Sequence, residues 1–389
     1  MNRLAILMFC VFSITTGEFV IAGILPEVAA DLHVSAGTAG LLVTAYAIGM
    51  TIGGPVLTAL TTHIDRKRLM LALLVVAVAG NAVSAIAPDF RVLLAARVVT
   101  ALITSTFFAQ AVVVVVRSAA PDRAATAVAR LALGMNLAMV LGAPLGTVIG
   151  RTWGWQATFA AISAACLLGA ALVAGFITAP PEPARSSAVA EFRVLGRRAV
   201  LLALAVTAVG NVGVLMVFSY LAPLLTDVAG HAAARLPVLL LGYGVGATIG
   251  GLLGGALFDR HPHTAQPILL GCLAAVLALA GAAATSPAPS AVAVVVIGAL
   301  GFAIIPGMQT RVMSAARDAP TLAMAVNASG YQVAAGTAGL VGGTIVDSTA
   351  GPRAVYLAAA GLTLGGLALT WLTIRAARPA TRQPAATGS

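Results

Sequence analysis

The chain has 389 residues, of which 60% are hydrophobic and only 9% are charged, and its mean hydropathy is +1.02. A typical globular domain carries roughly 25% charged residues, so this composition excludes most water-soluble folds. The 22 Lys and Arg residues outnumber the 12 acidic ones, but they fall between long apolar runs, which favours a membrane protein over one that binds nucleic acid.

A membrane-spanning helix needs about 20 mostly apolar residues, and Pro, Gly and charged clusters divide the chain at about that interval. The first apolar run, from Leu4 to Leu25, is too long for the core of a signal peptide and is interpreted as a span. The sequence predicts twelve spans, at residues 4–25, 36–60, 69–87, 92–116, 125–150, 156–178, 198–223, 235–257, 267–286, 290–313, 321–346 and 353–375.

These spans form two sets of six. We therefore expect an all-α integral membrane protein with an N-terminal six-helix half over residues 1–178, a cytoplasmic linker over 179–197, a C-terminal six-helix half over 198–375 and a tail over 376–389. With the termini on the cytoplasmic side, 17 of the basic residues fall on that side and only Arg91, Arg151, Arg235 and Arg353 fall on the other. The positive-inside rule therefore predicts a multi-pass protein with both termini in the cytoplasm.

The two halves contain an internal repeat at an offset of 197 residues. LLVTAYAIGMTIGGPVLTAL (41–60) aligns with VLLLGYGVGATIGGLLGGAL (238–257) with nine identities in twenty positions, including Tyr46 with Tyr243. The same offset pairs further identical residues: Pro26 with Pro223, Gly142 with Gly339, and Gly146 with Gly343. A duplicated six-span unit with parallel topology is typical of secondary transporters, whose binding site lies between the halves near the bilayer midplane.

Only two side chains of Asp, Glu, Lys or Arg lie well within the predicted spans, Glu18 in span 1 and Arg97 in span 4. At 1.5 Å per residue they lie roughly 10 Å and 8 Å below the same membrane face. A charge in hydrocarbon costs roughly 2.5–3.5 kcal/mol, so such residues usually face a polar cavity or each other. We hypothesise that Glu18 is the proton-coupling carboxylate and that Arg97 tunes it or competes for it; the alternative is a static structural pair.

Neutral polar side chains within the spans are candidates for contact with a substrate. Asn136 in span 5 pairs with Gln332 in span 11 at an offset of 196 residues, and Asn211 also lies near mid-depth. Tyr243 and Tyr331 are further candidates. The alternative for each is a hydrogen bond between helices, worth about 0.6 kcal/mol.

Four local patterns resemble a known family. TALTTHIDRKRLML after span 2 keeps the basic end of the loop motif G-x-L-x-D-R-x-G-R-K, and GALFDRHPHT after span 8 keeps its Asp and Arg. LLAARVVTA places an arginine in span 4, GAPLGTVIG matches the antiporter signature G-x-P-x-G, and GEFVIAGILPEVAADLHVS is similar to sugar and nucleoside exporters. The chain thus resembles the major facilitator superfamily, and within it the twelve-helix drug:proton antiporters that include arabinose, purine-nucleoside and chloramphenicol exporters.

The resemblance implies roles for particular residues. It implies that Phe108 and Phe302 lie on cavity-lining spans, and it assigns conformational or gating roles to Arg66, Lys67, Arg68, Gly142, Pro144, Gly146, Asp259 and Arg260. The loops depart from the family pattern, since Thr62 stands where the motif has Asp. Pro144 also removes one helix hydrogen bond, so span 5 is expected to bend there.

The resulting prediction is a proton-coupled efflux transporter of the bacterial cytoplasmic membrane that exports a small organic molecule, such as a drug, antibiotic, nucleoside or sugar, by alternating access. We expect a monomer in the lipid bilayer, powered by the proton gradient without cofactor or metal and without nucleic acid as a partner. An importer of the same fold and a non-transporting membrane sensor are the alternatives. An enzyme is not expected, because the histidines, at 33, 63, 231, 261 and 263, lie in loops or at span ends and no zinc, Ser-His-Asp or phosphate-loop pattern is found.

Overall fold

The computed structural model of the protein describes residues 3–61, 64–118, 124–177, 198–262, 264–315 and 320–377. Every regular element in these ranges is a helix. This is expected for a chain crossing lipid, where each backbone N–H and C=O must find its partner within the protein. The predicted linker at 179–197 and most of the predicted tail lie outside the described residues.

The N-terminal half holds the first six spans. Its helices are α1 (Arg3–Phe19), α2 (Ile21–Asp31), α3 (Ala36–Leu60), α4 (Arg66–Ala85), α5 (Phe90–Ser118), α6 (Ala124–Leu137), the π-helical turn η2 (Ala138–Gly142), α7 (Ala143–Trp153) and α8 (Trp155–Phe176). The helices of the C-terminal half are α10 (Arg198–Ser219), α11 (Leu221–Pro223), the π-helical turn η3 (Leu224–Val228), the 3-10 turn η4 (Ala233–Arg235), α12 (Leu236–Arg260), α13 (Ala265–Ala282), α14 (Pro287–Ala303), α15 (Ile305–Ala315), α16 (Pro320–Val346) and α17 (Ala354–Ala377).

Ten helical segments among the described residues are long and apolar enough to cross a bilayer, and the bent pair α1 and α2 forms an eleventh. α16 has 27 residues, a length of roughly 40 Å at 1.5 Å per residue. It packs between α3 and α10 in the bundle and carries the polar side chains Asn327, Tyr331 and Gln332. The arrangement accords with the twelve predicted spans.

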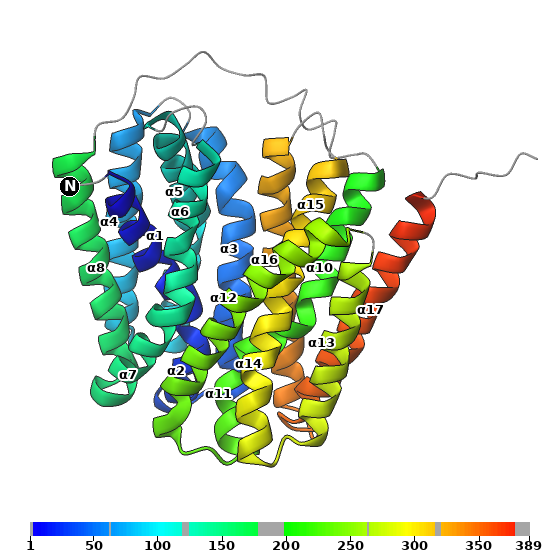
Figure 1. Cartoon of the computed structure of the whole chain (residues 1–389). Helices are drawn as coiled ribbons and strands as arrows, with labels where there is room; N and C mark the ends of the chain where they lie inside the picture. Colours follow the sequence, from blue (N-terminus) through cyan, green and yellow to red (C-terminus); the bar gives the residue numbers. More distant parts are fainter. Residues whose placement is uncertain are drawn as a thin grey trace, which may run out of the picture.

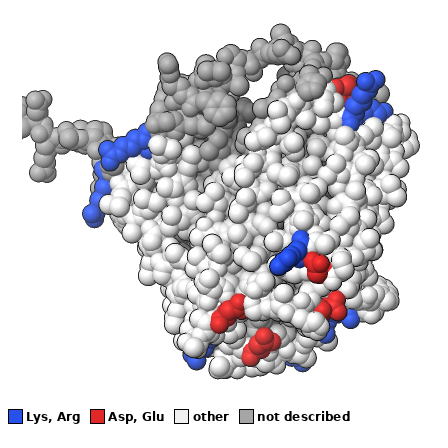
Figure 2. All heavy atoms as spheres, turned by 180° about the vertical axis from the view of Figure 1, so that it is seen from behind, with Lys and Arg blue, Asp and Glu red and all other residues white. Residues whose placement is uncertain are grey.

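The two halves lie side by side, with α1–α8 on the left of Figure 1 and α10–α17 on the right. Both described ends of the chain lie at the same end of the bundle, here named the termini face; the other end is the opposite face (Figure 1). Figure 2 shows that the middle of the visible surface is almost free of charged side chains and that most visible acidic ones lie toward the opposite face. A broad uncharged belt between charged ends is what a bilayer requires.

Three spans are interrupted, which the sequence did not predict. The breaks lie at Val20, Tyr220 and Ile304, and each is followed within six residues by a proline. A proline has no N–H to donate to the preceding turn, so the helix is weakened on its N-terminal side. α1 and α2 are bent by 48° at the first break, and span 1 continues to Asp31 instead of ending near Leu25.

The irregular part of span 5 lies just before the predicted bend. The π-helical turn η2 ends at Gly142, directly N-terminal to Pro144. The proline cannot bond the carbonyl of Val140 four residues earlier, which accounts for the wider turn at that point.

Two small-residue seams join the halves, and both lie toward the opposite face. In one, the first half of α3 packs against the last half of α16, and a Cβ on Gly343 would lie 2.8 Å from the carbonyl oxygen of Gly37. In the other, α12 packs against η2 and α7, and a Cβ on Gly244 would lie 2.7 Å from the Cα of Val140. Small residues let helix backbones approach this closely.

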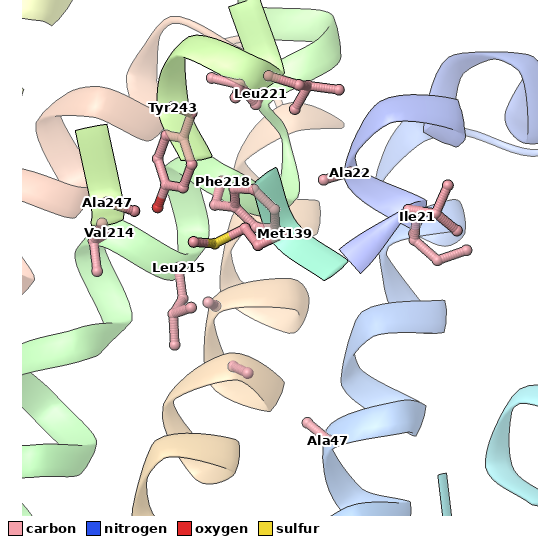
Figure 3. Packing of buried hydrophobic residues seen from close by; sticks show 14 of the residues in the cluster. Ile21, Ala22, Ala47, Met139, Val214, Leu215, Phe218, Leu221, Tyr243 and Ala247 are labelled. Atoms are coloured by element: carbon pink, nitrogen blue, oxygen red, sulfur yellow. The ribbon is translucent and has the colours of Figure 1, made fainter. Parts of the chain in front are cut away.

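An apolar cluster between these seams fills the space between the halves (Figure 3). Phe218 of α10 lies beside Met139 of η2 and Tyr243 of α12 in that view. Its ring centroid is 4.9 Å from that of Tyr243 and 5.9 Å from that of Phe19 in the other half. The cluster also contains the buried residues Ile21, Ala22, Leu215, Leu221 and Ala247. Together with the seams, it closes the opposite face.

Candidate functional site

A small cavity lies between the halves where span 1 is broken. Its lining residues come from α1, α2, α3, α5 and α16: Glu18, Ile21, Leu42, Val43, Tyr46, Ala47, Arg97, Gln332 and Ala335. Its volume is about 20 Å³, which is room for about one water molecule. The prediction that Glu18 and Arg97 lie at the same depth is therefore consistent with the structure, which places both at one cavity.

Arg97 is held within the N-terminal half. Its side chain is 1% exposed, and its Nη2 donates a hydrogen bond to the carbonyl oxygen of Gly17 at 2.5 Å. The guanidinium carbon lies 4.4 Å from the ring centroid of Tyr46 and 5.5 Å from that of Phe159. A planar cation stacked on aromatic rings and bonded to a backbone carbonyl is stabilised in a buried site.

Glu18 is bonded across the halves and not to Arg97. Gln332 Nε2 of α16 donates to Glu18 Oε1 at 3.0 Å, whereas no nitrogen of Arg97 lies within the 4.0 Å that defines an ion pair with Glu18. The second carboxyl oxygen, Oε2, is buried and has no hydrogen-bond partner among the described groups. Arg97 and Glu18 thus share the cavity without a direct ion pair, and one carboxyl oxygen is left to bind a proton or a ligand donor.

The break in span 1 explains how Glu18 reaches the cavity. Glu18 lies one position before Phe19, the last residue of α1, and the chain turns by 48° immediately after that helix. Arg97 packs beside Gly17, where a Cβ would be in ordinary van der Waals contact, 3.4 Å from Arg97 Nη1 and 3.6 Å from Asn81 Oδ1. The local sequence Gly-Glu-Phe therefore places the carbonyl of Gly17 and the carboxyl of Glu18 next to the same cavity.

The neutral polar candidates divide into several groups. Asn211 is buried and donates to Thr207 O at 2.8 Å and to Met308 Sδ at 3.0 Å, while its Oδ1 has no partner among the described residues. Gln332 contacts Glu18, as described above. Asn136, its counterpart in the repeat, is instead exposed on α6.

The aromatic candidates are not gathered at the small cavity. Tyr243 is buried in the apolar cluster against Phe218. Phe108, Phe302 and Tyr331 are half-buried on α5, α14 and α16. Their contact with a substrate stays a prediction.

The glycines of the span-5 signature pack within one half. A Cβ on Gly142 would overlap Thr16, and one on Gly146 would overlap Val20. Both contacts are with span 1, so Gly142 and Gly146 join α1 and α2 to η2 and α7. Pro144 is buried at the start of α7. Any role of these residues in a conformational change would act through the broken span that carries Glu18.

The charged gating candidates all lie at the termini face. Arg66, Lys67 and Arg68 begin α4; Lys67 Nζ donates to Ala174 O at 2.7 Å, near the end of α8, and Arg68 N donates to its N-cap Asp65. Asp259 and Arg260 end α12 and are exposed. Their gating role stays a prediction, and Thr62 lies outside the described residues.

Two residues at the seam and the cavity were missed by the sequence reasoning. Tyr46 stacks on Arg97, and its hydroxyl lies 2.8 Å from Thr104 Oγ1; its exact match to Tyr243 in the repeat was the available signal. Asp347 follows α16 and bonds the start of α3, which no local pattern indicates. Among the described residues, no group of three or more His, Cys, Asp or Glu side chains is placed to hold a metal ion.

Comparisons with known proteins agree with this architecture. The family model described as Major Facilitator Superfamily matches residues 7–321. The inner membrane transport protein YdhP of Escherichia coli K12 is 33% identical, with 92% of each chain covered. The chloramphenicol resistance protein of Streptomyces lividans is 35% identical, with 90% of each chain covered, and the MFS-type transporter YtbD of Bacillus subtilis is 34% identical, with 87% of this chain and 86% of that protein covered.

Solved structures show the same fold at low identity. A bacterial homologue of the human lysosomal transporter Spinster, solved in inward-facing unoccupied and occupied conformations, superposes with TM-scores of 0.76 and 0.78. The sequence identities are 16% and 15%, and 96% of each chain is covered in both cases. The predicted all-α major facilitator fold is thereby confirmed, and the twelve predicted spans are consistent with it.

Proposed function

This chain belongs to the Major Facilitator Superfamily of membrane transporters, which are not enzymes, and we propose that it exports a small organic molecule in exchange for protons. Glu18 is the observation that carries the proposal. It is an acidic side chain in the broken first span, it lines a cavity between the halves, and one of its carboxyl oxygens is unbonded. A carboxyl in hydrocarbon is costly enough that a functional role is the default interpretation.

The proposed chemistry is the gain and loss of one proton by Glu18. Burial and a nearby cation act in opposite directions on a carboxyl pKa, so the proton affinity of Glu18 depends on which side of the membrane the cavity opens to. Arg97 supplies a fixed positive charge at the same cavity. A proton taken from one side and released on the other then drives the substrate in the reverse direction.

In the proposed topology, export carries the substrate from the termini face to the opposite face. Because basic residues are concentrated in the loops on the side of the termini, we place the termini face in the cytoplasm. The face that the seams and the apolar cluster close is then the outer one. A substrate enters from the cytoplasm in this conformation and leaves on the other side after the halves rock.

A neutral or zwitterionic substrate fits the charge balance of the cavity, because one carboxylate faces one arginine. The Streptomyces lividans relative is named for chloramphenicol resistance, and chloramphenicol is a neutral molecule with hydroxyl and amide groups. Such groups are suited to the unbonded Glu18 Oε2 and to the neutral amide of Asn211. We therefore propose chloramphenicol-like neutral molecules as the first substrates to test.

Everted membrane vesicles test the proposal. With an imposed proton gradient, vesicles containing the protein should accumulate labelled chloramphenicol, and Glu18→Gln should abolish the gradient-driven part. Glu27→Gln is the matched control, since Glu27 lies in the same broken span but pairs with Arg151 at 3.6 Å at the opposite face. Full gradient-driven transport by Glu18→Gln would refute the role of Glu18. Higher accumulation in intact cells that contain the protein would instead indicate import.

A further inference from the structure

Four hydrogen bonds cross between the halves in the described part of the chain. Three lie toward the opposite face: Asp347 accepts from Ser35 and Gly37, and Thr44 Oγ1 donates to Gly336 O. The fourth joins Gln332 to Glu18, farther from that face. All four therefore favour the conformation in which the opposite face is closed.

The fourth bond differs from the others because its acceptor is a buried titratable group. Gln332 is 8% exposed, and its Nε2 donates to Glu18 Oε1 at 3.0 Å. Arg97 from α5 acts electrostatically on the same carboxyl, and Tyr46 from α3 and Tyr331 from α16 lie close enough to be affected by its charge. Among the described side chains around Glu18, only Gln332 donates a hydrogen bond to it, and that bond comes from the other half.

The strength of this bond depends on the charge of Glu18. A hydrogen bond to an ionised carboxylate is roughly twice as strong as one between neutral groups. A proton on Glu18 therefore weakens the attraction between the halves, and a substrate hydroxyl or amide that donates to the same carboxyl competes with Gln332 for it. Either event weakens a contact that crosses between the halves while the opposite face is closed.

The exchange of protons for substrate requires the contact between the halves to depend on whether Glu18 carries a proton or binds a substrate. If an empty carrier with an ionised carboxyl crossed freely between its two conformations, protons and substrate would no longer be linked. We propose that Gln332 is the positioning residue that prevents this crossing: its hydrogen bond to ionised Glu18 holds the empty transporter closed at the opposite face, until a proton or a substrate releases it. This inference rests on the proposed role of Glu18 as the proton carrier.

The experiment measures opening of the opposite face as a function of pH. A donor and an acceptor dye are placed on the full-length protein at Arg91 and Ala350, which are exposed on that face in the two halves, and energy transfer is followed from alkaline to acidic pH without substrate. In the parent protein, the opposite face should open as the pH falls. Gln332→Met keeps the length of the side chain without its donor, and Gln332→Leu serves as a second variant if the first does not fold.

Gln332→Met should raise the ratio of open to closed molecules about tenfold or more at alkaline pH, the effect of losing one hydrogen bond to a charged group, and should flatten the pH dependence. Thr44→Val is the matched control: it removes the bond to Gly336 in the same seam but no contact with a titratable group. It should multiply the ratio of open to closed molecules by the same factor at every pH and leave the pH dependence of that ratio unchanged.

The outcomes separate this inference from the proposed function. If Gln332→Met and Gln332→Leu keep the full pH slope while Glu18→Gln loses it, Gln332 does not couple the halves, but Glu18 still carries the proton. If Glu18→Gln keeps the slope, the proposed function itself fails. In transport assays the inference further requires that Gln332→Met still equilibrates chloramphenicol down its gradient but no longer accumulates it against one.

Discussion

Asp347 is expected to stabilise the closed opposite face through two hydrogen bonds between the halves. Its Oδ2 lies 2.5 Å from Ser35 Oγ, and its Oδ1 accepts from Gly37 N at 3.0 Å. Ser35 is the N-cap of α3, so a carboxylate from the C-terminal half stands at the N-terminus of a helix in the N-terminal half. Helix N-termini favour negative charge through their free N–H groups and their dipole.

The magnitude follows from these two bonds. Because Asp347 is exposed, each bond is taken at the lower part of the usual range, about 0.5–1 kcal/mol, with a few tenths more from the helix dipole. Asp347→Ala should therefore cost the closed conformation about 1.5–2 kcal/mol. This corresponds to a roughly ten- to thirtyfold higher ratio of open to closed molecules.

The dye pair at Arg91 and Ala350 provides the assay, read at alkaline pH, where the parent protein is expected to be mostly closed. Asp89→Ala is the control, because Asp89 Oδ1 caps α5 through Val92 N at 3.0 Å on the same face but within one half. It should lower thermal stability without changing the energy transfer. The reasoning is refuted if Asp347→Ala leaves the energy transfer unchanged, or if Asp89→Ala changes it as much.

Two further variants test the packing and the buried cation. Gly146→Ala should lower the denaturation temperature in detergent, because overpacking costs about 1–3 kcal/mol. Gly175→Ala should not lower it, because a Cβ on Gly175 would have no neighbouring atom within 4 Å. Equal denaturation temperatures for the two variants would contradict the packing of span 5 on span 1. Arg97→Lys should abolish transport although it keeps the positive charge. An ammonium group cannot both stack on Tyr46 and donate to Gly17 O as the planar guanidinium does. Normal transport by this variant would show that the charge alone suffices.

The sequence predicted the features that the bilayer constrains directly, namely the length of the apolar spans and the scarcity of charged side chains within them. Apolar runs long enough to cross a bilayer located the spans, and the expense of a charge in hydrocarbon singled out Glu18 and Arg97. The breaks in the spans were harder to predict, because a proline weakens a helix without determining whether it ends or bends. Pro26 was interpreted as the end of a span, yet α2 continues past it to Asp31.

The hydrogen-bond partner of Glu18 could not be predicted from charge. The only cation at its depth, Arg97, is instead bonded to Gly17 O and stacked on Tyr46 within its own half. The partner is a neutral amide 314 residues away in sequence. Neutral amides are tolerated in a membrane span more readily than charges, and a hydrogen bond between helices stabilises by only about 0.6 kcal/mol. Several such amides therefore occur in the spans, and none is marked as the partner.

The internal repeat explains why this contact occurs only once. At the offset of 197 residues, Glu18 aligns with Leu215, and Gln332 aligns within one residue with Asn136. The equivalent contact at the other seam would join Asn136 to a leucine, which accepts no hydrogen bond, and Asn136 is accordingly exposed. The two seams therefore share their close helix packing but differ in chemistry. Among the described residues, only the seam of α3 and α16 adjoins a titratable group that is hydrogen-bonded across the halves, so the proposed proton on Glu18 is expected to act on that seam and not on the other.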